Sequence, residues 1–475
     1  MDKESSCDIT EVNQMIETEE ITLETVLKRA VSKAKVQNRS QLVSYTKQIE
    51  QVDPIHVFEA AKELNKDRIF WTSTSDQFYI VGIGTTHELV ATENRFLETK
   101  RKFDLLLEEA LIYNPYEVEG TGIVALGGMS FDPKRKRSKL WKNFQPSQFT
   151  VPEYTLTIKE NKTFLTMTTE VNLFDTIESY LLKWNEAYKL LNKKVIMPKA
   201  AHIKSKIEIQ KDKWLTSVKK ATEKIKENKA KKIVLAREMR VKLNKHAEIS
   251  PILQKLIDGQ VNSYVFAFEK GKDCFIGATP ERLVKLNGDK LLSTCLAGTA
   301  PRGKTKKEDE RISIRLMNDQ KNRKEHDYVV QMIRRSIEKY CTNIKIPTEP
   351  IIYPLKNLHH LYTPVRASLK NEYSIFNIIE KLHPTPALGG EPREVSLAFI
   401  RENESMDRGW YGSPIGWLDN KQNGEFAVAI RSGLIQQDEV SLFAGCGVMK
   451  DSKPQMEYEE TNIKFLPMLT VLEDT

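Results

Sequence analysis

The stretch FAGCGVMKDSKPQMEYEETNIKF, residues 443–465, predicts a strand, a turn and a helix in direct succession. Its apolar first part carries Gly445 and Gly447, whose missing Cβ atoms let backbone N–H groups approach a ligand closely. Ser452 and Pro454 are typical of a turn that leads into a helix. A strand that runs directly into the last helix is typical of the whole chain, in which strands and helices are mixed without regular alternation.

Three charged residues follow on the predicted helix. Glu457 and Glu460 are three positions apart, so both carboxylates lie on one face, and Lys464 continues that face four positions later. Together with the glycines, they suggest a site for an anion and a hard cation. The plainer alternative is a surface helix with a solvated Glu–Lys pair.

Composition indicates a folded protein with a large core. The chain has 475 residues, of which 40% are apolar, and it contains no apolar run near the ~20 residues that span a membrane. The N-terminal stretch MDKESSCDITEVNQ is acidic and polar, unlike a signal peptide. The cysteines are odd in number, scattered and without a CxxC pair, which favours reduced thiols in a cytoplasm over disulfides or a zinc site. They are Cys7, Cys274, Cys295, Cys341 and Cys446.

The formal net charge of +8 raises the question of nucleic acid binding. The lysines, however, are interspersed with glutamates, as in KKATEKIKENKAKK, which is typical of solvated helix faces. No zinc finger, RNP motif or single basic arm is present in the sequence. A mild positive field equally suits a small anionic substrate.

The order of elements favours an α+β fold over a doubly wound sheet, because long connections separate similar strands. We expect polar helical structure up to about residue 50, a charged helix from about 87 to 112, and an exposed basic loop at FDPKRKRSKLWKNF. The stretch VIMPKAAHIKSKIEIQ is the best candidate for a boundary. It divides the chain into an N-terminal α+β half, residues 1–200, and a catalytic region, residues 201–475, on which that half packs.

Two residues are candidates for proton transfer. Lys232 stands where a helix gives way to the apolar strand IVLARE. Such a lysine is usually solvent-exposed, but an inward side chain would lose solvation and its pKa would fall toward ~7–8, as a general base requires. Glu281 in GATPERL follows a glycine and a proline at a turn. It either pairs with Arg282 at the surface or, if buried, has a raised pKa and donates a proton.

Further candidates are anion-binding or polar residues in apolar surroundings. Arg431 lies on the otherwise apolar predicted strand AVAIRSG, and a buried arginine requires an anionic partner such as a carboxylate. Gly298 and Thr299 in CLAGT form a glycine turn with a hydroxyl that suits a carboxylate. His383 in HPTPALGG has no second His or Cys at zinc spacing, so a structural hydrogen bond is the favoured interpretation.

The order of these motifs is more specific than any one of them. KIVLAR, GATPERL, LAGT, KNRKEH, HPTPALGG, DRGWYGSPIGW, AIRSG and AGCGV…EYEET…K occur in the order found in chorismate-utilising enzymes. The chain resembles their isochorismate synthase branch, and within it the menaquinone-pathway enzymes of Gram-positive bacteria. The resemblance is dense from about residue 205 onward and looser upstream. It implies the chorismate-binding fold of anthranilate synthase component I, with large, mostly antiparallel sheets packed with helices.

The resemblance also implies the chemistry of the site. In this family Mg²⁺ bridges the enzyme and the ring carboxylate of chorismate, and the matching ligands here are Glu325 and Glu460, with Glu457 close by. Lys232 matches the general base that activates water for attack at ring carbon C2. Glu281 matches the general acid that protonates the departing C4 hydroxyl.

Other matching positions contact the substrate. Those that hold the enolpyruvyl carboxylate are Tyr411, Arg431 and the backbone at Gly445, and those around the ring and its carboxylate are Gly298, Thr299, Ala387 and Lys464.

Two departures from sister enzymes point to water as the nucleophile. Anthranilate synthases typically have glutamine where Lys232 stands, and aminodeoxychorismate synthases typically have a lysine in place of Ala297. Salicylate synthases share Lys232 and Glu281 and go on to eliminate pyruvate, so they stay an alternative, as does an isochorismate synthase of a siderophore pathway. No glutamine-hydrolysing motif is present, so no ammonia supply is built in, and we expect no amidotransferase subunit. We also expect neither nucleic acid nor a membrane among the partners.

Overall fold

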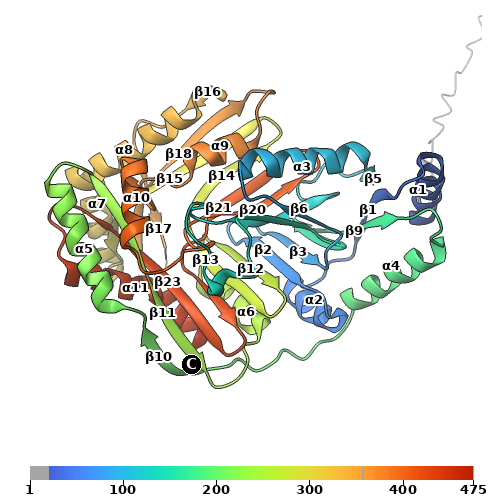
Figure 1. Ribbon diagram of the computed structural model, residues 1–475, viewed down its shortest axis with the longest axis horizontal. Coiled ribbons are helices and arrows are strands. Elements are labelled where there is room, and N and C mark those ends of the chain that lie inside the picture. The colour runs from blue at the N-terminus through green and yellow to red at the C-terminus, as the bar shows by residue number, and fades with distance from the viewer. Residues whose placement is uncertain (1–20, 356–357, 474–475) are drawn as a thin grey trace, which may run out of the picture.

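The computed structural model describes residues 21–355 and 358–473, and these form two large sheets with helices on the outer faces (Figure 1). The first sheet has the strand order β10-β11-β23-β22-β13-β12-β2-β3-β8-β9-β1-β5, with β19 added beside β11. Their bounds are β10 Ile203–Glu208, β11 Lys232–Leu243, β23 Glu439–Val448, β22 Ser432–Gln436, β13 Asp273–Thr279, β12 Tyr264–Lys270, β2 Arg68–Ser73, β3 Phe78–Ile83, β8 Tyr154–Lys159, β9 Lys162–Val171, β1 Gln41–Ile49, β5 Leu111–Tyr113 and β19 Gly390–Glu391.

The second sheet has the order β16-β18-β15-β14-β21-β20-β6-β7-β4, with β17 beside β18. The bounds are β16 Cys341–Lys345, β18 Leu358–Leu369, β15 Lys290–Pro301, β14 Arg282–Asn287, β21 Gly424–Val428, β20 Pro414–Asp419, β6 Val124–Met129, β7 Ser147–Val151, β4 His87–Val90 and β17 Ile351–Pro354. Among the described strand pairs, β1 with β5 is parallel and the others are antiparallel. The predicted α+β class with mostly antiparallel sheets is confirmed.

The helices cover the outer faces of both sheets (Figure 1). They are α1 Leu23–Gln37, α2 Pro54–Ala60, α3 Arg95–Glu109, α4 Ile177–Leu191, α5 Lys211–Lys226, α6 Ile249–Gly259, α7 Lys306–Asn318, α8 Gln320–Ile337, α9 Ile375–Leu382, α10 Arg393–Asn403 and α11 Pro454–Leu472. Two short 3₁₀ helices span Ala61–Leu64 and Lys139–Trp141.

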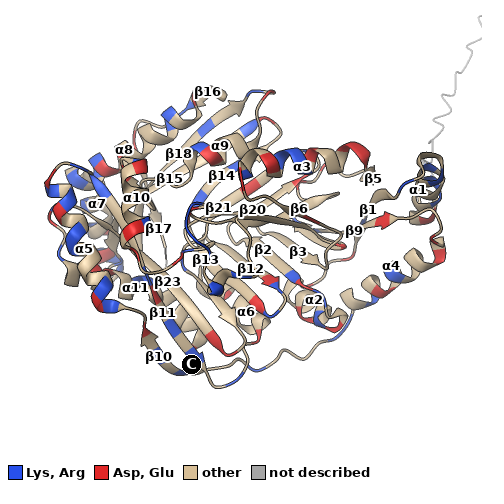
Figure 2. Cartoon of the chain, viewed as in Figure 1, with Lys and Arg blue, Asp and Glu red and all other residues tan. Residues whose placement is uncertain are grey.

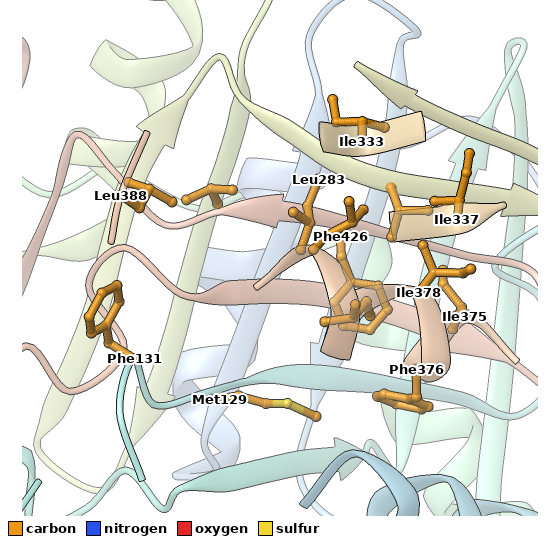
Figure 3. Close-up of a cluster of buried hydrophobic side chains, with 14 of the residues drawn as sticks. Met129, Phe131, Leu283, Ile333, Ile337, Ile375, Phe376, Ile378, Leu388 and Phe426 are labelled. Carbon is orange, nitrogen blue, oxygen red and sulfur yellow. The ribbon is translucent and has the colours of Figure 1, made fainter. Parts of the chain in front are cut away.

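Three hydrophobic clusters hold these layers together. An aromatic-rich cluster lies between the two sheets and joins Trp71 and Phe266 of the first to Trp417 of the second. A second cluster packs α1, α2 and α6 on the first sheet, and a third packs α3, α8 and α9 on the second. Figure 3 shows part of the third, where Ile333 and Ile337 of α8 lie near the second sheet. Helix α8, which carries Glu325, is therefore anchored by its apolar face.

Three local predictions were wrong. The expected helical structure up to residue 50 ends at Gln37, and β1 follows inside the first sheet, where its side chains from Gln41 to Thr46 are buried. The predicted helix over 87–112 is shorter, because β4 and β5 flank α3. The basic loop has exposed charges, but Trp141 and Phe144 within it are buried between the sheets. In each case packing of apolar side chains outweighed the local polar composition.

Both sheets contain strands from either side of residue 200. In the first, β2 pairs with β12, and in the second, β6 pairs with β20. Residues 192–202 form no helix or strand and link α4 to β10 along the edge of the molecule (Figure 1). The division into residues 1–200 and 201–475 stays a prediction.

Candidate active site

The chain crosses between the two sheets at two neighbouring points, and each crossing carries a predicted site residue. Glu281 lies in the turn that joins β13 of the first sheet to β14 of the second. Arg431 lies in the connection from β21 back to β22, and not within a strand as predicted. The crossings are hydrogen-bonded, since the N–H of Val428 donates to the Glu281 carbonyl at 2.9 Å and that of Ala278 donates to the Arg431 carbonyl at 3.1 Å.

Arg431 has a left-handed backbone, with φ of 51°, and the residue is half-buried. Burial lowers its pKa, while the charges of Tyr411, Glu281 and Glu460 nearby oppose that change. Within residues 21–355 and 358–473 the side chain makes no hydrogen bond or ion pair. An arginine with its donors unused is suited to a carboxylate supplied by a ligand.

Glu281 has the electrostatic setting of a proton donor. Burial raises the pKa of its carboxyl to about 7, and the positive charges of Arg431, Lys232 and Lys464 act against that rise. Three predicted site residues from distant parts of the chain therefore lie within electrostatic reach of Glu281. Because this pKa is close to neutral, the carboxyl binds a proton at mildly acidic pH and releases it at alkaline pH.

Lys232 is the first residue of β11, and its side chain lies over Gly447 of β23. A Cβ placed on Gly447 would be 2.6 Å from Lys232 Cε, so the glycine makes room for the lysine stem. The Lys232 side chain is 21% exposed, and its Nζ donates to Glu325 Oε1 of α8 at 3.1 Å. The predicted base and one predicted metal ligand are thus in direct contact.

The other glycine of β23, Gly445, lies beside two further predicted substrate contacts, Lys464 and Tyr411. The pairing of β22 with β23 stops at Ser432 and Phe443. From Ala444 to Val448, β23 is therefore paired only with β11 among the described strands. The carbonyl oxygen of Gly445 accepts a hydrogen bond from Lys464 Nζ at 2.8 Å. A Cβ on Gly445 would lie 3.4 Å from the hydroxyl oxygen of Tyr411, whose pKa burial raises to about 12.

Gly298 and Thr299 form a bulge in β15. The register of β15 with β18 shifts between Ala297 and Thr299, and Gly298 has φ of 78°, which favours glycine. The backbone N–H of Thr299 donates to Asn322 Oδ1 of α8 at 3.3 Å. The Thr299 hydroxyl lies 2.9 Å from His360 Nδ1.

Sequence reasoning missed His360. Burial, together with the charges of Arg431 and Lys464, lowers its pKa to about 4, so the imidazole is neutral at pH 7. Because the charge of Arg431 acts on His360, and His360 contacts Thr299, the bulge at Gly298 and Thr299 lies near Arg431. The signal in LHHLYT was two adjacent histidines in a strand pattern, and that pattern contains no metal or triad spacing by which to choose one.

Ala387 lies in the loop HPTPALGG, whose last residues lead to the start of β11. The loop ends in β19, whose Gly390 and Glu391 pair with Ile233 and Lys232. Its histidine has the predicted structural role, because the buried His383 Nε2 lies 3.0 Å from the Phe131 carbonyl oxygen and burial lowers its pKa well below the usual range.

The three predicted metal carboxylates differ in their partners. Glu325 is paired with Lys232, and Glu460 with Lys464 at 2.5 Å. Glu457 Oε2 is buried with no hydrogen-bond partner among the described residues. No group of three or more His, Cys, Asp or Glu side chains in the described ranges is arranged to hold a metal ion by itself.

A cavity of about 900 Å³ lies away from these residues, beside the β2–β3 turn. It is bordered by Asp53, Ser75, Tyr79, Asn161 and Asn262, among others. None of the predicted site residues borders it.

A family model described as chorismate binding enzyme matches residues 28–473. The chain belongs to this family. It is 40% identical over 470 residues to isochorismate synthase MenF of Bacillus subtilis, covering 96% of this chain and 99% of that protein. It is 32% identical over 461 residues to the salicylate biosynthesis isochorismate synthase of Pseudomonas aeruginosa, covering 95% and 94%. The predicted resemblance is confirmed.

Solved structures confirm the fold of this chorismate binding enzyme. The menaquinone-specific isochorismate synthase MenF of Escherichia coli superimposes with a TM-score of 0.78 at 21% identity, covering 94% of this chain and 100% of that one. Anthranilate synthase component I of Streptococcus pneumoniae gives 0.69 at 18% identity, covering 82% and 92%. In the described residues no helix is long and apolar enough to cross a membrane.

Proposed function

We propose that this protein is an isochorismate synthase, which adds water at C2 of chorismate and removes the C4 hydroxyl. The observation that carries this proposal is the meeting of Lys232, Glu281 and Arg431 around one point where the chain crosses between sheets. Similarity to isochorismate synthases over almost the whole chain supports it.

Lys232 is proposed as the general base and Glu281 as the general acid. In the structure Lys232 is paired with Glu325, so it must leave this pair and lose its proton before it can accept one from water. Glu281 starts protonated at pH values below about 7 and delivers its proton to the leaving hydroxyl.

Arg431, with no partner among the described side chains, is proposed to bind the enolpyruvyl carboxylate, next to the Tyr411 hydroxyl and the backbone at Gly445. Gly298, Thr299, Ala387 and Lys464 are proposed to line the ring and its carboxylate.

We propose Mg²⁺ as the cofactor, held by Glu325 and Glu460 with Glu457 close by. The donor set fits, because Mg²⁺ prefers a few carboxylates completed by water and substrate, and Glu457 Oε2 is a buried acceptor without a partner in the described chain. When bound, Mg²⁺ would neutralise the ring carboxylate of chorismate. Glu325 and Glu460 would then exchange their lysine partners for the ion.

The proposed setting is menaquinone biosynthesis in the cytoplasm, without an amidotransferase subunit or nucleic acid. The four described cysteines are free and buried, which fits a reducing compartment. Lys, Arg, Asp and Glu are mixed over the helices with no single basic face in view (Figure 2). Similarity to the salicylate biosynthesis enzyme of Pseudomonas aeruginosa favours a salicylate pathway as the second candidate.

Purified protein incubated with chorismate and Mg²⁺ tests the proposal. We expect isochorismate by product chromatography and no pyruvate in a lactate-dehydrogenase-coupled assay. Release of pyruvate at the rate of chorismate loss would identify a salicylate synthase instead. Binding of chorismate with Mg²⁺ but without any turnover would refute the proposed activity.

A further inference from the structure

One buried arginine fastens helix α11 to the first sheet. Arg237 lies on β11 and its side chain is 2% exposed. Its Nε donates to Thr461 Oγ1 at 2.7 Å, and a terminal nitrogen donates to the side-chain oxygen of Asn462. The guanidinium carbon also lies 4.3 Å from the ring centre of Tyr458 and 4.8 Å from that of Phe465. A single side chain therefore contacts two turns of α11.

These contacts alternate with the site residues of the same helix. Each site residue directly precedes an Arg237 contact, in the pairs Glu457 and Tyr458, Glu460 and Thr461, and Lys464 and Phe465. One position corresponds to a rotation of about 100° around a helix. The face that Arg237 holds is thus next to the face that carries the two carboxylates and the lysine, so any rotation of α11 displaces all three.

The apolar sequence pattern of α11 does not by itself select this rotation. Helix α11 buries Phe465 and Met468, yet Met456, Ile463 and Leu466 are about half exposed on other sides. A helix with apolar residues on several faces has no single preferred orientation on a sheet. The directional hydrogen bonds from the planar guanidinium supply that orientation.

The charge of Arg237 is balanced within the cluster. Glu208 of β10 has a carboxylate oxygen 3.7 Å from Arg237 and accepts a hydrogen bond from the Tyr458 hydroxyl. Lys211 of α5 lies 3.6 Å from Glu208 and 4.0 Å from the centre of the Tyr458 ring. A buried arginine needs such compensation, and here the compensating groups also contact α11.

We propose that Arg237 is a positioning residue, which sets the rotation of α11 and thereby places Glu457, Glu460 and Lys464 for Mg²⁺ and chorismate. The proposal rests on the roles proposed above for these three residues.

The test compares two buried threonine-to-valine variants. Thr461→Val removes the acceptor of Arg237 Nε, and also the hydroxyl that donates to the Tyr458 carbonyl, with little change in volume. Thr166→Val is the control, because its hydroxyl is bonded to Thr46 at 2.9 Å, far along the first sheet. We expect Thr461→Val to raise the half-saturating Mg²⁺ concentration and the KM for chorismate about tenfold, with a smaller fall in kcat.

Hydrogen exchange without ligands gives a second readout. Amides of residues 454–466 should exchange faster in Thr461→Val than in wild type, whereas Thr166→Val leaves them unchanged. Arg237→Lys keeps the charge but loses the planar guanidinium group. It should likewise raise the half-saturating Mg²⁺ concentration and the KM for chorismate.

The proposal is overturned if Thr461→Val and Arg237→Lys only lower the melting temperature, as the control Thr166→Val does. In that case the half-saturating Mg²⁺ concentration, the KM for chorismate and hydrogen exchange of residues 454–466 would equal those of wild type. A different outcome addresses the proposed function. If wild-type protein turns over chorismate without Mg²⁺, the metal role of the carboxylates fails, while KM for chorismate and exchange in 454–466 still decide the role of Arg237.

Discussion

The strand-borne and the helix-borne halves of the site are held in different ways. Lys232 and Glu281 lie on or between strands of the sheets: Lys232 is paired with Glu391 of β19, and the Glu281 carbonyl accepts a hydrogen bond from the Val428 N–H. Glu325 and Glu460 extend from helices and their side chains are 47% and 49% exposed, against 21% for Lys232. The proton-transfer groups are therefore preorganised, whereas the carboxylates stay accessible to ions and solvent.

This difference suggests a division of labour. A general base and acid must be placed accurately relative to the reacting carbons, which favours a rigid scaffold. Metal ligands that share the ion with substrate and water must exchange partners during binding, which favours accessible helix positions. The lysine partners of Glu325 and Glu460 are present in the structure as the cations to be replaced.

The largest expected effect comes from the strand-borne base. Lys232→Gln should lower kcat by about 10²–10⁴-fold, because water is no longer deprotonated, while the fold stays intact. Lys231→Gln is the matched control, since this neighbouring lysine is 73% exposed. Steady-state kinetics with circular dichroism check both, and wild-type turnover in Lys232→Gln would refute the base assignment.

Glu281→Gln should have a loss of similar or slightly smaller size. In wild type the rate should fall as pH rises above about 7, because Glu281 then loses the proton that it must donate. A pH–rate profile from pH 5.5 to 9 measures this fall in rate, the alkaline limb of the profile. A wild-type profile that stays flat across pH 7, or a variant that retains the limb, would count against the acid role.

A helix-borne carboxylate should affect metal dependence more than chemistry. Glu460→Ala should raise the half-saturating Mg²⁺ concentration by about 10–100-fold and weaken chorismate binding with it. Glu459→Ala, an exposed neighbour on the same helix, serves as control. An unchanged Mg²⁺ titration in Glu460→Ala would remove the distinction between the two halves.

The smallest expected effect is on stability. The pKa of Glu281 is raised from 4.5 to about 7 in the folded protein, so the folded state binds more protons than the unfolded one in this range. The free energy of unfolding therefore falls as pH rises from about 4.5 to about 7. Glu281→Gln should melt roughly 1–2 °C higher than wild type at pH 8 and equally at pH 4. A lower melting temperature at pH 8 would show that Glu281 is stabilised in its charged form.

The sequence predicted the elements whose apolar pattern matches their burial. Trp214, Val218, Ala221 and Ile225 recur at the spacing of one helix face, and all four are buried on α5. The family resemblance identified the site residues without showing how they meet. That Glu281 and Arg431 lie at adjacent crossings between two sheets depends on long-range strand pairing, which no local pattern encodes.

The failures have the same physical origin. β1 is polar in composition but occupies a position inside the first sheet, and Trp141 of the basic loop is buried by contact with Phe275 and Phe443 from distant strands. The sequence alone did not indicate a role for Arg237, because its hydrogen-bond partners are on a helix more than two hundred positions later.

Turnover in ¹⁸O-labelled water tests the central claim most directly. If Lys232 activates a solvent water for attack at C2, mass spectrometry of the isochorismate formed by wild type will show one ¹⁸O, placed at C2, and Lys232→Gln will form almost none. Unlabelled isochorismate from wild type would show that the C4 hydroxyl migrates without solvent water and would contradict the account.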